Sequence, residues 1–111
     1  MHAIVCHASK DLRVDPQDEP QTLAPDQLRV RIARGGICGS DLHYYQHGGF
    51  GTVRLREPMV LGHEVSAVID AVGSDAGLFK VGQRISVSPS RPCGGCRYCH
   101  CLLYTSPSPR D

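Results

Sequence analysis

Three cysteines packed into the segment Cys93-Gly-Gly-Cys-Arg-Tyr-Cys99 constrain this chain more than any other feature of its sequence. Two consecutive CxxC spacings bring three thiols within reach of one ion, and the glycines let the backbone bend around it. The segment therefore predicts a metal site with Cys93, Cys96 and Cys99 as ligands. Structural zinc sites close with four ligands, so this set supplies three of them.

Two other interpretations of the cysteine segment stay open. Thioredoxin-like redox centres also use a CxxC pair, although they place it in a β-α-β context that this sequence does not show. The residues Cys96-Arg-Tyr-Cys99-His100 match the attachment pattern of c-type haem literally. That attachment requires export, and residues 1–14 do not have the pattern of a secretory signal. Metal ligation in a reducing compartment explains the six cysteines better than disulfides do.

Length and charge exclude several classes of protein. A chain of 111 residues accommodates one domain, but not a catalytic domain together with a dinucleotide-binding domain. The net charge is +1 and the basic residues are dispersed, which disfavours nucleic-acid and membrane-surface partners. No segment approaches the roughly 18 apolar residues of a membrane span, so we expect a cytoplasmic protein.

Short β-branched and apolar stretches recur along the chain. They predict an opening hairpin over residues 3–6 and 12–14, and a half-buried strand over residues 28–32 in which apolar and charged residues alternate. Two later strands are predicted over residues 60–72 and 85–88. A turn is predicted at Val81-Gly82-Gln83. Many short strands with little helix indicate a mainly β, barrel-like core.

One short helix is expected between these strands. Residues 38–46 have helical composition, with Ser40 or Asp41 as the N-cap. The glycine-rich residues 48–51 are expected to form a loop. The final residues, 101–111, resemble the translation of a sequencing-library adaptor rather than native protein, with a disordered Ser/Pro-rich terminus as the alternative. We therefore expect the folded domain to occupy residues 1–100.

An isolated cysteine and a distant histidine form the second candidate metal site. Catalytic zinc needs nitrogen, sulfur or oxygen ligands on rigid elements, with one position open to substrate. Cys38 follows Gly35-Gly36-Ile37 at the end of a predicted strand, and His63 precedes the carboxylate of Glu64. A single Cys or His is more often a structural residue, so the flanking residues decide between these interpretations.

Those flanking residues carry a family resemblance. Gly35-Gly-Ile-Cys-Gly-Ser-Asp-Leu-His-Tyr-Tyr45 and Pro58-Met-Val-Leu-Gly-His-Glu64 resemble the catalytic zinc region of zinc-dependent medium-chain dehydrogenases, and within them the sorbitol and L-idonate 5-dehydrogenase groups. The resemblance covers essentially all of residues 1–100. It implies a GroES-like β-barrel catalytic domain, the N-terminal domain of alcohol dehydrogenases.

The resemblance also implies roles for individual residues. Cys38 and His63 correspond to zinc ligands, and Glu64 lies beside the metal as a direct or water-mediated ligand. Ser40 corresponds to a relay hydroxyl, and His43 to the imidazole that passes the proton to solvent. Tyr44 corresponds to a residue of the substrate wall, although a tyrosine that only packs against its neighbours is as common. Asp41 either orients a zinc ligand or caps the helix.

The cysteine segment resembles the structural zinc lobe of the same family. In that lobe the fourth Cys lies several residues past Cys99, and Cys101 is not expected to be this ligand.

The function implied is the reversible NAD- or NADP-linked oxidation of a secondary alcohol on a polyol or sugar acid, as in the oxidation of L-idonate to 5-keto-gluconate. Zinc is implied at a catalytic and a structural site. No G-x-G-x-x-G occurs, because the nearest glycine string fails at Arg54, so the cofactor rests on resemblance alone. The chain is thus expected to be a fragment without a Rossmann domain, inactive by itself and part of a homo-oligomer when complete. The alternative is a non-catalytic zinc-binding module.

The remaining candidates are weaker. Cys6 is expected in the core, and His2, His7 and His47 are expected to be exposed. Arg54 and Arg56 have the chemistry to bind the carboxylate of a sugar acid, although solvated strand arginines are commoner.

Overall fold

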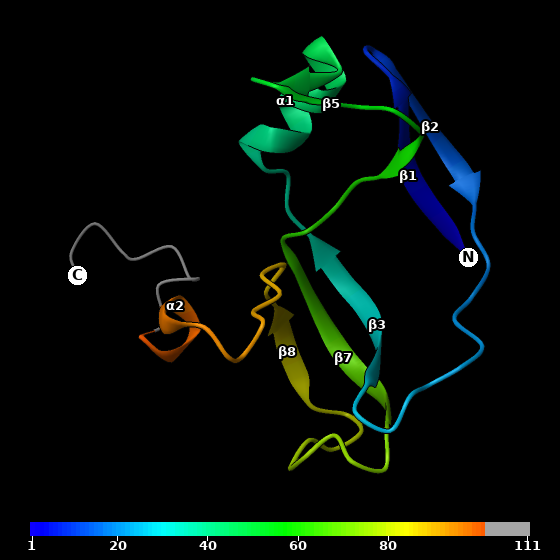
Figure 1. Cartoon of the computed structure of the whole chain (residues 1–111). Helices are drawn as coiled ribbons and strands as arrows, with labels where there is room; N and C mark the ends of the chain where they lie inside the picture. Colours follow the sequence, from blue (N-terminus) through cyan, green and yellow to red (C-terminus); the bar gives the residue numbers. More distant parts are fainter. Residues whose placement is uncertain (102–111) are drawn as a thin grey trace.

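The computed structural model describes residues 1–101, in which most of the regular structure is strand (Figure 1). One antiparallel sheet has the order β2-β1-β6 and contains β1 (His2–Ala8), β2 (Asp11–Pro16) and β6 (Met59–Val60). A second has the order β3-β7-β8 and contains β3 (Leu28–Gly35), β7 (Val65–Val72) and β8 (Arg84–Val87). The predicted mainly β class is confirmed.

The opening hairpin forms as predicted and is longer than the apolar residues alone indicated. Its turn contains Lys10 in the left-handed region, with φ of 60°. Cys6 is fully buried, as expected for a core residue, and its thiol donates to the carbonyl oxygen of Tyr44 at 3.8 Å. The hairpin is thereby attached to the helix that carries part of the candidate site.

Two of the three histidines expected on the surface are there. His2 and His47 are exposed, but His7 is half-buried and its ring nitrogen contacts the carboxylate of Asp15. The prediction for His7 is therefore wrong, because hairpin pairing brings an acidic residue of β2 to the side chain of β1.

The second sheet contains the other part of the core. Ala67 and Ile69 on the central strand β7 are each 1% exposed. On β3, Leu28 and Val30 are half-buried as the alternation predicted, but Ile32 is 56% exposed. Ile32 lies on an edge strand whose register shifts between Ile32 and Arg34, which interrupts the alternation.

Strand boundaries differ from the apolar runs by a few residues. The run over residues 60–72 forms β6 and β7 with a break between them, where Gly62 has φ of 108°. The last predicted strand begins and ends one residue earlier, as β8. The turn before it is present, and Gly82 adopts φ of 91° there.

Helix α1 (Gly39–His47) lies close to the predicted range, but its N-cap is Cys38 rather than Ser40 or Asp41. The carboxylate of Asp41 reaches back from the first turn and accepts a hydrogen bond from the Cys38 N–H at 2.9 Å. The predicted N-cap was wrong because this acceptor comes from inside the helix. Gly48 ends the helix with φ of 68°.

The segment after α1 is not entirely a loop, contrary to expectation. β4 (Gly49–Phe50) pairs with β5 (Val53–Arg54). A Cβ atom at Gly49 would overlap the carbonyl oxygen of Val53, so the close approach of these two strands requires glycine.

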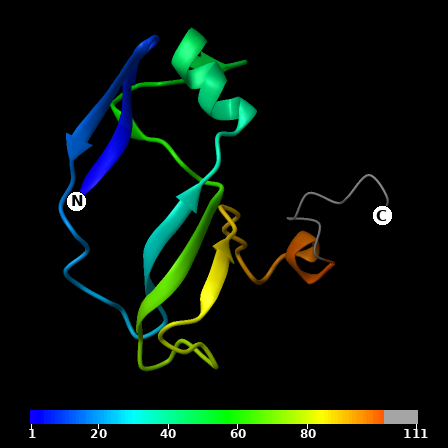
Figure 2. The ribbon, with the colours of Figure 1, turned by 180° about the vertical axis from the view of Figure 1, so that it is seen from behind.

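Helix α2 (Arg97–His100) stands away from both sheets at the end of the segment that leaves β8, as the two opposite views show (Figures 1 and 2). Within residues 1–101, no helix is long and apolar enough to cross a membrane. The predicted tail from residue 102 onward lies outside the described residues.

Two connecting segments bring the sheets together. The chain passes from β3 to α1 through residues 36–38, and from β6 to β7 through residues 61–64. They cross between the two sheets (Figure 1), where the N–H of Gly36 donates to the carbonyl oxygen of Glu64 at 2.7 Å. This crossing positions the residues of the second candidate metal site.

Candidate metal centres

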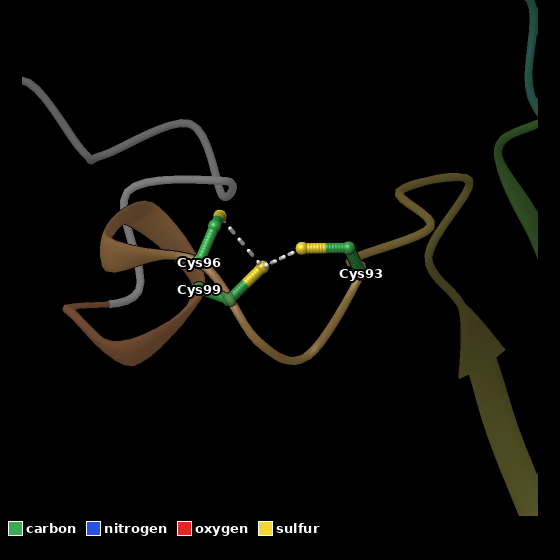
Figure 3. A group of neighbouring side chains, drawn as sticks. All are labelled: Cys93, Cys96 and Cys99. Atoms are coloured by element: carbon green, nitrogen blue, oxygen red, sulfur yellow. Dashed lines mark hydrogen bonds between the residues drawn. The ribbon is translucent and has the colours of Figure 1, made fainter.

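The cysteine segment gathers its three thiols around one point (Figure 3). The sulfur of Cys99 lies 3.6 Å from that of Cys93 and 3.5 Å from that of Cys96. A tetrahedral zinc ion with Zn–S bonds of about 2.3 Å separates its sulfur ligands by about 3.8 Å. Two of the three sulfur–sulfur distances are therefore close to an edge of a zinc tetrahedron, and all three thiols lie within 4.8 Å of one another.

The environment of Cys93 favours its thiolate, the form that binds metal. The backbone N–H of Gly95 and, after it, the thiols of Cys96 and Cys99 together lower the pKa of Cys93 to about 7. Because these donors favour the thiolate, the segment is arranged to receive a cation.

The alternative interpretations of this segment gain no support from the fold. Every strand pair within residues 1–101 is antiparallel, so the described part of the chain offers no β-α-β context for a redox pair. Cys93 joins the cluster, whereas a haem attachment motif would use only Cys96 and Cys99. The thiol of Cys101 donates to the carbonyl oxygen of Arg97 at 3.0 Å and lies outside the cluster.

Cys38, His63 and Glu64 converge at the crossing of the two connecting segments. Their ligand atoms all lie within 4.8 Å of one another. Gly36 leaves space for Glu64, because a Cβ atom at Gly36 would lie 3.0 Å from Oε2 of that side chain and 3.3 Å from its Cβ. A thiolate, an imidazole and a carboxylate are the donors that zinc accepts in catalytic sites, so the set fits this ion.

Ser40 and Asp41 lie against the two nitrogens of the His63 ring. The hydroxyl oxygen of Ser40 is 3.5 Å from Nε2, and Oδ1 of Asp41 is 3.6 Å from Nδ1. The other oxygen of Asp41 caps the helix, so one buried carboxylate contacts both Cys38 and His63. The two roles predicted for Asp41 are therefore compatible in this geometry.

Hydrogen bonds shift the titration of this cluster toward charged forms. The Ser40 hydroxyl, its N–H and the His63 ring lower the pKa of Cys38, while burial and the charge of Glu64 oppose them. The Cys38 thiol is the main cause that raises the pKa of His63, and Asp41 adds to it against burial. The thiolate of Cys38 is thus favoured before any metal binds.

A groove of about 540 Å³ opens beside the second cluster. His63 and Glu64 line it together with residues of β3, β7 and β8, among them Arg34, Ser66 and Ser86. This volume lies within the range of small-molecule sites. A metal held by Cys38, His63 and Glu64 would therefore have space for a ligand at its open position.

His43 and Tyr44 lie elsewhere on α1. The ring of His43 is 6.1 Å from that of Phe50, and Tyr44 meets Phe50 edge-on at 5.7 Å. Neither side chain lines the groove or belongs to the cluster of candidate ligands. Their roles in proton transfer and substrate binding stay predictions.

The arginine that does line the groove was missed by sequence reasoning. Arg54 donates to the carbonyl oxygen of His47 at 3.1 Å, and neither it nor Arg56 lines the groove. Arg34 does, at the end of β3 and directly before Gly35 and Gly36. The sequence signal that could have identified Arg34 was its position directly before Gly35 and Gly36, which lead to Cys38.

Residues 24–106 match the family model described as the alcohol dehydrogenase GroES-like domain. The chain is 39% identical over 99 residues to sorbitol dehydrogenase of Bacillus subtilis, covering 89% of this chain and 28% of that protein. It is 53% identical over 70 residues to L-idonate 5-dehydrogenase (NAD(P)(+)) of Escherichia coli, covering 63% of this chain and 20% of that protein.

A solved structure has the same fold over most of this chain. The crystal structure of L-idonate 5-dehydrogenase from Escherichia coli superposes with a TM-score of 0.78 and 40% identity over 89% of this chain and 28% of that one. The chain thus spans less than a third of the length of these relatives.

Proposed function

Because the chain belongs to the alcohol dehydrogenase GroES-like domain family, we propose that it supplies the catalytic zinc region of an NAD(P)-linked oxidoreductase. Its substrate is a secondary alcohol on a polyol or sugar acid, as in L-idonate 5-dehydrogenase. The observation that carries the proposal is the convergence of Cys38, His63 and Glu64 beside a ligand-sized groove. The names of the two relatives support the substrate class.

Cys38 and His63 would hold the zinc ion, with Glu64 as a direct or water-mediated ligand. The bound ion supplies Lewis acidity to the hydroxyl oxygen of the substrate. Asp41 orients this site, because its carboxylate contacts the backbone of Cys38 and the ring of His63. Glu64 is fixed by the contact of its backbone with Gly36.

Oxidation of the alcohol releases a proton from oxygen and a hydride from carbon. The Ser40 hydroxyl lies beside His63 and relays the proton, because it accepts one from the substrate oxygen as it passes its own on to water. His43, one turn further along the exposed surface of α1, delivers it to solvent. No hydrogen bond joins Ser40 to His43 within the described residues, so we assign the transfer between them to water.

Two further assignments complete the proposal. Cys93, Cys96 and Cys99 hold a structural zinc ion with a fourth ligand from elsewhere in the complete enzyme. Tyr44 contributes to the substrate wall, with its ring oriented by Phe50. By resemblance, the complete enzyme is a cytoplasmic homo-oligomer that uses NAD or NADP.

The 111-residue chain by itself is inactive in this proposal. Residues 1–101 contain two three-stranded antiparallel sheets and the two-stranded β4-β5 pair, and no dinucleotide-binding fold. Hydride transfer requires an acceptor held against the substrate carbon, so the zinc region alone has no electron acceptor.

Steady-state kinetics of the complete enzyme test the proposal. We expect NAD(P)-dependent oxidation of L-idonate or sorbitol with kcat/KM at least about 100-fold above that for ethanol, because a site built to bond hydroxyl groups rejects analogues that lack them. The isolated chain with excess zinc is the control and should neither turn over substrate nor bind cofactor in calorimetry. Equal activity on ethanol, or turnover by the isolated chain, would contradict the proposal.

A further inference from the structure

We propose that Arg34, together with Ser66 and Ser86, forms a subsite that binds the carboxylate group of a sugar-acid substrate. This inference rests on the proposed function and deepens it, because it favours a sugar acid over a neutral polyol. The three residues belong to three different strands and line the same groove as His63 and Glu64.

Strand register places the three side chains in one row. Arg34 on β3 lies opposite Ser66 on β7, and Ser66 lies opposite Ser86 on β8. Residues directly opposite each other in antiparallel strands share a face of the sheet, with Cβ atoms roughly 5 Å apart. A guanidinium group and two hydroxyl groups therefore stand side by side along one wall of the groove.

The guanidinium of Arg34 retains most of its hydrogen-bonding capacity. One N–H donates to the carbonyl oxygen of Ala33 at 2.7 Å, and no carboxylate forms an ion pair with Arg34 among residues 1–101. By contrast, Arg29 on the same strand pairs with Asp70 at 2.9 Å. The planar fork of an unpaired guanidinium matches the two oxygens of a carboxylate, and serine hydroxyls are suitable additional donors.

A neighbouring charge also favours an anion at this wall. Arg84 lines a second groove of about 390 Å³ that shares Arg34 and Ser66 with the first. Within the described residues Arg84 has no acidic partner in an ion pair. The single carboxylate on the larger groove, that of Glu64, belongs to the cluster with Cys38 and His63.

The size of the groove allows one molecule to reach both groups. Its volume of about 540 Å³ is within the range for small-molecule ligands, and it is lined at once by Arg34 and by His63. A six-carbon sugar acid bound at its carboxylate by Arg34 would place its chain along the wall that leads to the candidate zinc ligands. The position of the reacting hydroxyl would then be set by its distance from the carboxylate.

Three variants of the complete enzyme test the subsite through kcat/KM for L-idonate and for sorbitol, which lacks a carboxylate. Arg34→Gln should lower kcat/KM for L-idonate about 10- to 100-fold, mainly through KM. It should leave kcat/KM for sorbitol within about twofold of the wild-type value. Arg34→Lys should restore part of the loss, because it keeps the charge without the fork. Arg54→Gln is the control, since it removes the same charge outside the groove, and should change neither substrate. A parallel fall for both substrates, or no fall, would overturn the proposal.

A binding measurement separates this inference from the proposed function. D-Gluconate should bind the wild-type enzyme in calorimetry and bind Arg34→Gln about 10-fold or more weakly, whether or not either substrate is oxidised. If the enzyme oxidises neither substrate but shows this difference, the proposed function fails and the carboxylate subsite is supported. If the substitution weakens binding of hexitol phosphates but not of D-gluconate, the site binds phosphate and the carboxylate assignment is wrong.

Discussion

The two candidate metal centres differ in how far apart their residues lie in the sequence. Cys93 and Cys99 are six residues apart, and their segment stands away from both sheets (Figure 2). Ser40 and His63, which meet in the second centre, are 23 residues apart and are brought together by the crossing of two connecting segments. The first centre requires only a bend of the backbone, whereas the second requires both sheets to form.

This difference predicts different consequences of losing a ligand. A metal bound by a local segment stabilises that segment, because few other contacts hold it in place. A metal bound at the crossing occupies a site that strand pairing, a helix cap and the Asp41 carboxylate already organise. Removal of a ligand from the cysteine segment should therefore mainly lower the stability of the protein. Removal of a ligand at the crossing should mainly lower its catalytic activity.

The largest effect is expected at the crossing. In the complete enzyme, Cys38→Ser should remove one zinc ion per subunit and lower kcat/KM by about 1000-fold or more, because the Lewis acid is worth several kcal/mol in the transition state. Elemental analysis and steady-state kinetics measure both. Cys6→Ala, which removes a buried thiol outside both clusters, should keep its zinc. Full zinc content in Cys38→Ser would show that Cys38 is not a ligand.

The next effect concerns the cysteine segment. Cys96→Ser should remove the other zinc ion and lower the Tm by about 5 °C or more, while the remaining folded enzyme keeps most of its kcat. Thermal unfolding and kinetics on the same preparation separate the two quantities. Tyr98→Ala changes an exposed residue between two candidate ligands and is the matched control. A loss of kcat as large as that of Cys38→Ser would remove the distinction between the centres.

A smaller effect should separate the two roles of Asp41. Asp41→Asn keeps an oxygen that can accept from the Cys38 N–H but removes the charge near His63. It should weaken zinc binding about 10-fold without a measurable change in stability, whereas Asp41→Ala should also cost about 1 kcal/mol of folding free energy. Chelator competition and denaturant unfolding measure the two. If Asp41→Asn binds zinc as tightly as the wild type, Asp41 serves only as a helix cap and does not orient the zinc ligands.

The smallest effect is a shift in thiol reactivity without metal. Because hydrogen bonds lower the pKa of Cys93 to about 7 from 9.0, its alkylation by iodoacetamide should rise as the pH increases through about 7. Below that pH a proton competes with the metal for the sulfur of Cys93. Zinc affinity should therefore fall as the pH decreases. Peptide mass spectrometry follows Cys93 separately. In guanidinium chloride, the pH midpoint of Cys93 alkylation should return to the ordinary range of a cysteine. An identical midpoint in the folded and the unfolded protein would contradict the hydrogen bonds to Cys93.

Much of the fold followed from local patterns. The alternation at Leu28 and Val30 of β3, the opening hairpin and the turn at Gly82 were predictable because they depend on neighbouring residues. The errors occurred where distant residues decide. His7 is half-buried by its contact with Asp15 across the hairpin, and Gly49 forms a strand because β5 approaches it closely.

The sequence by itself determined the cysteine segment, because its spacing alone places three thiols near one point. It also identified Cys38, His63 and Glu64 as candidates through the motifs around them. Only the tertiary structure decided that Asp41 contacts two of these residues at once, and that Arg34 rather than Arg54 lines the groove. The reason is physical: strand register and the crossing of two connecting segments set these contacts, and both depend on pairing between residues that are distant in the chain.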